Sequence, residues 1–496
     1  MNDGQKKDLS AEAWERVFNN GGIRMKKHIA AAAAFCLVLG TAGSPCASAE
    51  SYSFDYDLME QLYYAENTSP SIGDANQDNI IDGRDATAVL TEYAAVSAGK
   101  GASFTEDQNK CADVNTDSTI DARDATAILT FYALQSSGSK ITIEKYMAGI
   151  KADSVLKTMS LHDKICQMFI VRPESLAGES DVTSATQATA DALKQNPVGG
   201  LIYFTKNLSS REQITDMIST TKQYAVDAGK VPLFYGVDEE GGVVSRCAEA
   251  LGTVAFEPMY SYKDKKTVTA YANARKLAYD ISQFGFNLDF APVADTWSNP
   301  ENTVIGTRAY SDDFVITSRL VGAAVRGFNE SGVYCTLKHF PGHGDTVEDS
   351  HDGMAVSNRT AEQLKENEYL AFEMGINAGA DMVMMGHITV PSIDDMPASL
   401  SQKIVEGQLR DVLGYDGVVI TDALGMGAVA NAYSSSASAV MAVEAGCDML
   451  LDPKDLNEAI AGIENAVKGG SISEEHINRS VKRILSLKCK RMDIDN

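Results

Sequence analysis

Three histidines lie in the short segment KHFPGHGDTVEDSH, residues 338–351, of a chain that has only seven. His339 and His343 are four residues apart, and His351 follows Asp349 by two. An imidazole can bind a metal ion or transfer protons near neutral pH. The segment therefore predicts either a metal site or a catalytic loop.

A zinc site of the HExxH kind requires two histidines on one helical face and a glutamate after the first. Pro341 and Gly342 lie between His339 and His343, which argues against a helix, and no Glu follows His339. The cysteines are scattered, without the CxxC spacing of zinc sites. The pattern favours catalysis over zinc binding, and His343 on its own fits a residue that structures the loop.

Eight short apolar runs surround this segment in the sequence. Each has the length of a strand and nearly continuous apolar side chains, as in parallel strands covered on both faces. The runs read QMFIV, GGLIYF, PLFYGVD, FNLDFAPVAD, YCTLKHF, DMVMMGH, DGVVITD and CDMLL. Helix-like segments such as residues 211–229 and 360–379 separate them. These alternations predict an α/β fold, a TIM (β/α)8 barrel.

Five of these runs end in ionisable side chains. They are Asp238, Asp295, Lys338 with His339, His387 and Asp422. In a barrel these ends converge on the face where the βα loops build the active site. An unpaired buried charge is costly, so five such ends are hard to explain by structure alone. Asp422 taken alone would also fit a helix N-cap after a strand.

A different segment occurs twice before the barrel. DANQDNIIDGRDATAVLTEYA starts at Asp74 and DVNTDSTIDARDATAILTFYA starts at Asp113. Acidic or amide side chains occupy loop positions 1, 3, 5, 9 and 12, and position 7 offers a backbone carbonyl, which together suit one calcium ion per loop. The predicted ligands are Asp74, Asn76, Asp78, Ile80, Asp82 and Asp85, and then Asp113, Asn115, Asp117, Thr119, Asp121 and Asp124.

The two loops depart from a standard EF-hand in the same places. Position 12 is Asp instead of Glu, and position 6, normally Gly, is Asn79 or Ser118. Asn tolerates the left-handed conformation better than Ser, so the first loop is the better match. Apolar residues at helical spacing predict a helix after each loop, and no strong helix is expected before either.

Composition and the N-terminus limit the possible partners. The chain has 496 residues and a formal net charge of −25, which argues against nucleic acid or an anionic membrane as a partner. Residues 25–49 read as a secretory signal, with Met25 as the true start or with residues 1–24 as an unusual extension. The expected organisation is a signal region 1–49, a short segment 50–69, the repeat 70–134, a linker 135–141 and the barrel 142–496.

The duplicated loop-helix unit resembles a dockerin. Dockerins are small all-α modules that bind calcium and attach cell-wall-degrading enzymes to cohesin-bearing scaffold proteins. The resemblance covers residues 70–134 and implies two structural Ca²⁺ ions and a cohesin partner. It also implies a secreted, extracellular, cellulosome-associated protein. The cohesin-facing residues it implies are Gly83, Arg84, Ala122 and Arg123.

Four stretches of the second part closely resemble glycoside hydrolase family 3, in its NagZ-like beta-N-acetylglucosaminidase branch. They are KHFPGHGDTVEDSH, GVDEEGGVVSR, LDFAPVADTWSNPENTVIGTRAY and VVITDALGMGAV. The resemblance implies Asp422 as nucleophile, Asp349 with His351 as the general acid/base pair, and no cofactor for catalysis. The sugar-binding residues it implies are Asp238, Arg246, Arg308, Lys338, His339 and His387. An arginine of the family's EGGRV motif is replaced by Val243, so altered packing or subsite contacts are expected.

Taken together, these features predict an exo-acting, retaining beta-N-acetylglucosaminidase (beta-N-acetylhexosaminidase). Its substrates would be chitin-type or peptidoglycan-derived oligosaccharides with a terminal GlcNAc. A histidine can serve as the acid because its unperturbed pKa near 6.5 suits proton transfer in both directions. A beta-glucosidase or beta-xylosidase of the same fold, an N-acetylglucosaminide phosphorylase and a catalytically silent sugar-binding scaffold module stay open as alternatives. Turnover of aryl glycosides, with and without phosphate, separates them.

Overall fold

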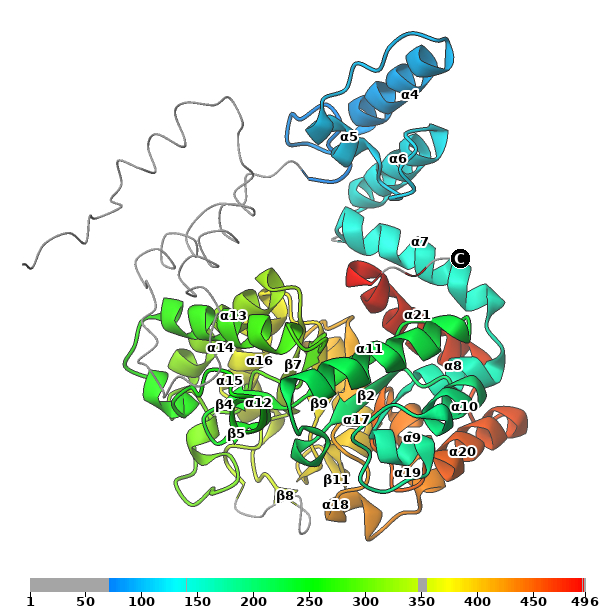
Figure 1. Cartoon of the computed structure of the whole chain (residues 1–496). Coiled ribbons are helices and arrows are strands. Elements are labelled where there is room, and N and C mark those ends of the chain that lie inside the picture. Colours follow the sequence, from blue (N-terminus) through cyan, green and yellow to red (C-terminus); the bar gives the residue numbers. More distant parts are fainter. Residues whose placement is uncertain (1–70, 140, 347–354, 493, 495–496) are drawn as a thin grey trace, which may run out of the picture. The chain divides into compact units, whose positions relative to one another are not determined.

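The computed structural model describes residues 71–139, 141–346, 355–492 and 494 (Figure 1). Contacts divide the chain into Met1–Glu66 and Asn67–Asn496, and every described residue belongs to the second unit. The predicted signal region 1–49 and the segment 50–69 lie outside the described residues.

A sheet of eight parallel strands forms the centre of the C-terminal part (Figure 1). Its hydrogen-bonded order is β12-β9-β7-β6-β3-β2-β1-β13. The strands are β1 (Phe169–Val171), β2 (Gly200–Tyr203), β3 (Phe234–Val237), β6 (Leu288–Asp289), β7 (Tyr334–Phe340), β9 (Met382–Met385), β12 (Val418–Thr421) and β13 (Leu450–Leu451). Each of the eight apolar runs in the sequence supplies one strand. The predicted TIM barrel is confirmed, with nearly continuous burial along the strands as both-face coverage requires.

The two end strands of this order, β12 and β13, meet along a narrow seam. Ile420 and Met449 form a single parallel bridge. The Thr421 N–H donates to the Met449 carbonyl over 3.0 Å, and the Met449 N–H donates to the Val419 carbonyl over 2.9 Å. These bonds close the sheet into a barrel directly before Asp422.

Helices follow the strands and cover the outside of the barrel (Figure 1). Several begin at a side chain that accepts a backbone N–H, such as Ser210 before α11 and Asp313 before α14. The helices of this part are α7 (Ile143–Thr158), α8 (Leu161–Gln167), α9 (Pro173–Ala177), α10 (Gln187–Gln195), α11 (Arg211–Asp227), α12 (Arg246–Leu251), α13 (Thr267–Ser282), α14 (Phe314–Glu330), α15 (Ala361–Glu366), α16 (Tyr369–Asn377), α17 (Gln402–Ile404), α18 (Gly427–Ala430), α19 (Ser435–Ala445), α20 (Leu456–Gly469) and α21 (Glu474–Arg491).

Short elements fill the βα connections on the side where the strands end. A hairpin of β4 (Glu239–Gly241) and β5 (Val244–Ser245) follows β3, and β8 (Ala355–Val356), β10 (Ile388–Val390) and β11 (Asp394–Pro397) form a small second sheet. The remaining turns are the 3-10 helices η1 (Thr205–Asn207), η2 (Met259–Tyr262), η3 (Gly306–Arg308) and η4 (Ala398–Leu400), and the π-helix η5 (Val405–Val412).

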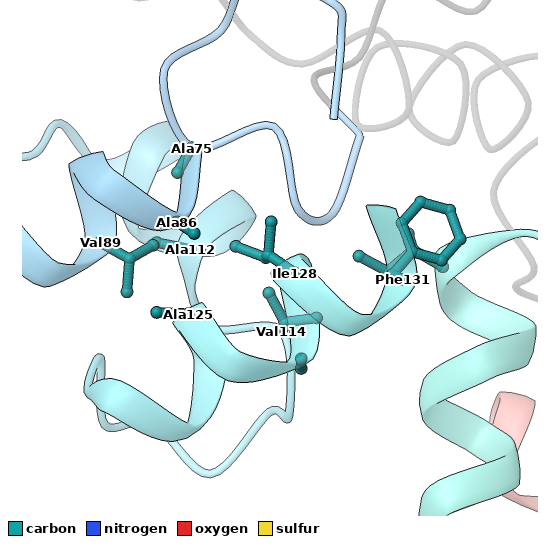
Figure 2. Packing of buried hydrophobic residues seen from close by; sticks show 10 residues of the cluster. Ala75, Ala86, Val89, Ala112, Val114, Ala125, Ile128 and Phe131 are labelled. Carbon is teal, nitrogen blue, oxygen red and sulfur yellow. The ribbon is translucent and has the colours of Figure 1, made fainter. Parts of the chain in front are cut away.

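The N-terminal part is all-α and is built on the duplicated loops. Helices α4 (Gly83–Ser97) and α6 (Ala122–Ser136) follow the two loops as predicted. A third helix of 7 residues, α5 (Glu106–Ala112), precedes the second loop, where no strong helix was expected. Figure 2 shows the core of this part, in which small side chains let the helices approach closely. Its members include Ala75, Ala86, Val89, Ala112, Val114, Ala125, Ile128 and Phe131.

Capping boxes start both loop-following helices. The Asp82 side chain accepts from the N–H of Arg84, while Asp85 accepts from the N–H of Asp82. Asp121 and Asp124 repeat this arrangement in the second copy. The same aspartates are therefore predicted metal ligands and helix caps, which links each loop's geometry to the helix that follows it.

Candidate active site

Asp238, at the end of β3, lies between two cations. Its Oδ1 is 3.0 Å from Lys338 Nζ on β7, and its Oδ2 accepts from Arg246 over 3.0 Å. Burial raises the pKa of this carboxyl, but the charges of Lys338 and Arg246 outweigh burial and the pKa lies below its usual value. Asp238 is therefore an anionic acceptor at the mouth of the barrel. The Arg246 guanidinium also lies over the Phe204 ring, 5.0 Å from its centroid.

Glu240, which the sequence did not single out, holds two of the predicted sugar-binding residues. Its carboxylate accepts from Arg308 Nε and Nη2 at 2.8 and 2.7 Å, and Lys338 Nζ lies 2.7 Å away. Burial would raise the pKa of Glu240, but Lys338 and Arg308 hold it far below its usual value. The sequence signal for this residue is the run of three carboxylates, Asp238, Glu239 and Glu240, that directly follows β3.

His339 is fixed by Asp295, the predicted end of the strand before it. The His339 Nδ1 lies 2.7 Å from Asp295 Oδ2, and the other oxygen accepts the His343 N–H over 2.7 Å. Burial would raise the pKa of Asp295, but the nearby imidazoles, His339 first, lower it overall. Asp295 is thus a charged anchor for the histidine segment, and His343, hydrogen-bonded to Thr346, structures that loop.

Asp422 follows β12 at the same barrel face. Its backbone N–H donates to the Met385 carbonyl over 2.8 Å, and its Oδ1 accepts the Ala423 N–H over 2.7 Å. Burial would raise the pKa of this carboxyl, but the nearby His387, His339 and Lys338 lower it below its usual value. Asp422 is therefore ionised at neutral pH, as a carboxylate nucleophile must be.

His387 supports Asp422 from within the protein. It is fully buried, with Nδ1 2.8 Å from Ser399 Oγ and Nε2 2.9 Å from the Ala423 carbonyl. A carbonyl only accepts, so Nε2 carries a proton. These contacts fix the backbone next to Asp422, and the contact of His387 with a sugar stays a prediction.

The predicted acid/base residues Asp349 and His351 lie outside the described residues. The described residues before and after this segment contact each other. Asp345 Oδ2 accepts from Ser357 Oγ over 3.0 Å and pairs with Arg359 Nε at 3.3 Å.

Val243 stands in the turn between β4 and β5 and is 67% exposed. Arg246, three residues later, faces Asp238 instead. The side chain at position 243 is therefore largely exposed to solvent, and altered subsite contacts stay a prediction.

The two N-terminal loops have matching geometry. In the first, Asp74 accepts the N–H groups of Asp78 and Asn79 at 3.0 and 2.9 Å. In the second, Asp113 accepts the equivalent groups at 3.1 and 3.0 Å. Ser118 adopts φ 62° and Asn79 φ 65°, so both take the left-handed conformation that Gly usually supplies at this position. The second loop is as well formed as the first.

The donor set of these loops fits a hard cation. Burial raises the pKa of Asp85, and the charges of Asp74 and Asp78 raise it further, so a cation at the centre of the loop would stabilise its carboxylates. Arg84 supplies part of that charge from the outside, at 2.9 Å from Asp78 and 2.8 Å from Asp82. In the described parts of the chain, no three His, Cys, Asp or Glu side chains group closely as metal ligands. The Asp74 and Asp113 carboxylates accept backbone N–H groups of their own loops.

Comparison with known proteins identifies a family for the C-terminal part and for the N-terminal part of the chain. The profile of the glycosyl hydrolase family 3 N terminal domain matches residues 160–487, and that of the dockerin type I domain matches residues 72–130. Dockerin type I domains bind calcium structurally, which supports the predicted cation in each loop. The likeness of the chain to a dockerin followed by a family 3 domain is confirmed.

Curated relatives and solved structures agree. A beta-hexosaminidase of Stenotrophomonas maltophilia (strain K279a) is 34% identical over 298 residues, 59% of this chain and 86% of that protein. One from Xylella fastidiosa (strain M23) is 35% identical over 58% of this chain and 86% of its own. The structure of a family 3 beta-N-acetylglucosaminidase from Paenibacillus sp. strain FPU-7 matches with TM-score 0.64 and 36% identity, covering 67% of this chain and 63% of that one. A Beutenbergia cavernae beta-N-acetylhexosaminidase matches with TM-score 0.60 and 28% identity, covering 66% and 98%.

Proposed function

Because the chain belongs to glycosyl hydrolase family 3, we propose that it is an exo-acting, retaining beta-N-acetylglucosaminidase that releases terminal GlcNAc from chitin-type or peptidoglycan-derived oligosaccharides. It is a glycoside hydrolase of the beta-N-acetylhexosaminidase type, as its relatives are. The GlcNAc-terminated substrates and the two-step retaining mechanism are our proposal.

The observation that carries the proposal is the ionised carboxylate of Asp422 at the end of β12. It stands on the barrel face where the strand ends of β3 and β7 bring Asp238, Arg246, Lys338 and His339 together. A nucleophilic carboxylate beside fixed cationic donors is what a retaining glycosidase needs, because the attacked sugar must be oriented through its hydroxyl groups.

Two steps transfer the sugar. Asp422 attacks C1 of the terminal GlcNAc, the C1–O bond breaks, and the leaving oxygen takes a proton from His351. Water then attacks C1 of the ester while His351 takes the water proton, and Asp422 leaves as a carboxylate. Asp349 orients the His351 ring and stabilises its protonated form.

A panel of nitrophenyl glycosides of GlcNAc, glucose and xylose tests the proposal. We expect the highest kcat/KM for GlcNAc, an unchanged rate on adding phosphate, and release of beta-GlcNAc seen by proton NMR. Preference for glucose or xylose, phosphate-dependent formation of a sugar phosphate, or saturable binding without turnover would each replace the proposal with one of the alternatives.

The dockerin part supports attachment to a cohesin scaffold outside the cell. Helices α4 and α6 expose equivalent apolar side chains, Leu90 and Tyr93 on one and Leu129 and Tyr132 on the other, each between 42% and 46% exposed. Exposed apolar side chains on two helices are typical of a protein-binding face. The secretory signal belongs to this proposal too, and no helix within the described ranges is long and apolar enough to cross a membrane.

A further inference from the structure

Glu240 is almost completely buried, and both of its carboxylate oxygens are held by the predicted sugar-binding residues Arg308 and Lys338. Its side chain is 1% exposed, whereas that of Arg308 above it is 15% exposed. Asp238 directly follows β3 and Glu240 lies two residues later in β4, and the two carboxylates both contact Lys338. The result is an alternating row of charges that runs from Arg246 to Arg308.

The hydrogen-bond count at Lys338 follows from this row. An ammonium group has three N–H donors. Asp238 Oδ1 at 3.0 Å and Glu240 Oε1 at 2.7 Å take two of them. Among the described residues the third donor has no recorded partner, and its direction is fixed because the other two are bound.

Arg308 is oriented in the same way. A guanidinium group has five N–H donors in one plane. Nε and Nη2 each donate to Glu240, and Nη1 donates to the Val304 carbonyl over 3.0 Å. One N–H on Nη1 and one on Nη2 are left.

We propose that Glu240 is the positioning residue of the sugar-binding donors: it sets the direction of the last free N–H of Lys338 and of the two free N–H groups of Arg308. Fixed donors need no reorganisation when charge develops on the substrate, which is how such groups contribute to rate. The inference rests on the proposed function in that Lys338 and Arg308 bind the sugar.

The charge of Glu240 is essential to this role. A glutamine at this position would present an amide N–H₂ to Arg308 or Lys338, and donors cannot bind donors. Glu240 also helps to keep Lys338 protonated. Burial lowers the pKa of Lys338, and Glu240 and Asp238 more than offset it, so that the pKa lies above its usual value. Loss of Glu240 should therefore lower the pKa of Lys338, so that Lys338 loses its proton at a lower pH.

The test compares Glu240→Gln with Glu174→Gln in the full chain. Glu174 is a matched control, a buried glutamate paired with Lys206 at 3.2 Å and hydrogen-bonded to Asn207, away from Lys338 and Arg308. For Glu240→Gln we expect kcat/KM to fall by about two powers of ten, with a higher KM and a lower kcat. The alkaline limb of its pH profile should move to lower pH. Glu174→Gln should stay within about threefold of the parent at every pH.

A second variant, Glu240→Asp, tests the inference if Glu240→Gln does not fold. Glu240→Asp keeps the charge but shortens the reach, so kcat/KM should fall less than for Gln and the alkaline limb should stay near the parental position. Parental kinetics in either folded variant, or an unmoved alkaline limb in Glu240→Gln, would overturn the inference. The kcat/KM values of the variants and the parent are compared on the aryl glycoside that the parent cleaves fastest. A different sugar preference of the parent would therefore contradict the proposed function and leave this test intact.

Discussion

Asp422 and His351 have different proposed roles, so substituting each should give a different kinetic pattern. Asp422→Ala should abolish turnover of every glycoside, because both steps pass through its ester. The loss should exceed about four powers of ten in kcat for nitrophenyl GlcNAc, measured by release of nitrophenolate. Azide added to this variant should yield, if anything, an alpha-configured product.

His351→Ala should still form the glycosyl-enzyme from aryl glycosides, since nitrophenolate leaves without a proton. We expect a burst of nitrophenolate followed by slow hydrolysis, and azide should restore turnover as a beta-configured glycosyl azide. Natural disaccharides should stay unreactive because their leaving groups need the proton. Formation of an alpha-configured glycosyl azide by this variant would show that the nucleophile and acid/base roles of Asp422 and His351 are assigned the wrong way round.

Asp349→Asn should lower kcat/KM by about one power of ten or more while the melting temperature stays unchanged. The amide can still bind the His351 ring, but it no longer stabilises the imidazolium. Activity profiles from pH 5 to pH 8 check this. Rates within twofold of the parent across that range would remove Asp349 from the mechanism.

Among the elements, the strands and their ends could be predicted from sequence, because buried parallel strands need continuous apolar runs and a charged end is then conspicuous. The side chains with which these charged residues pair could not be predicted from sequence. Arg308 reaches Glu240 across 68 residues of chain, and nothing in the local pattern relates them. The helix α5 was missed because it has only seven residues, and a single turn or two shows little periodicity.

The C-terminal helix α21 buries a lysine and so gives the barrel a pH-dependent stability. Burial lowers the pKa of Lys488 to about 7, while its ammonium donates to Gln167 Oε1 and the Gly199 carbonyl. The folded pKa is below the unfolded one, so between pH 7 and about 10 the unfolded chain binds more protons and stability rises with pH. This contribution is lost as the pH falls through about 7, because well below that pH the lysine is charged in both states.

Lys488→Met should remove this dependence. The free energy of unfolding of the parent, relative to Lys488→Met, should rise by about 1.4 kcal/mol per pH unit from pH 7 to pH 9. Urea unfolding followed by tryptophan fluorescence measures it. Lys482→Met, on the same helix but 45% exposed and paired with Asp153, is the control and should run parallel to the parent. Equal slopes for all three proteins would contradict the effect.

At the scale of the whole molecule, the calcium loops and the barrel should respond separately to chelation. Removing Ca²⁺ leaves clustered carboxylates in both loops uncompensated, so residues 71–134 should lose their fold and the full chain should lose cohesin binding. Activity on nitrophenyl GlcNAc should change by less than about twofold, because no predicted ligand lies in the barrel. Calorimetry with a cohesin and an activity assay on the same sample check both outcomes. Loss of binding and activity together would show that the two parts depend on each other.

We expect the seam between β12 and β13 to open more readily than the boundary between β12 and β9. Only the Ile420–Met449 bridge and a few backbone bonds join these strands, whereas β12 is paired with β9 along its whole length. Amide deuterium exchange should therefore be faster at Thr421 and Met449 than at Val383 and Ile420, since local opening costs least where the fewest bonds break. Asp422 follows Thr421 directly. Each such opening would displace the carboxylate that we propose as the nucleophile, so the lifetime of the closed seam would set an upper limit on how long a productive geometry persists.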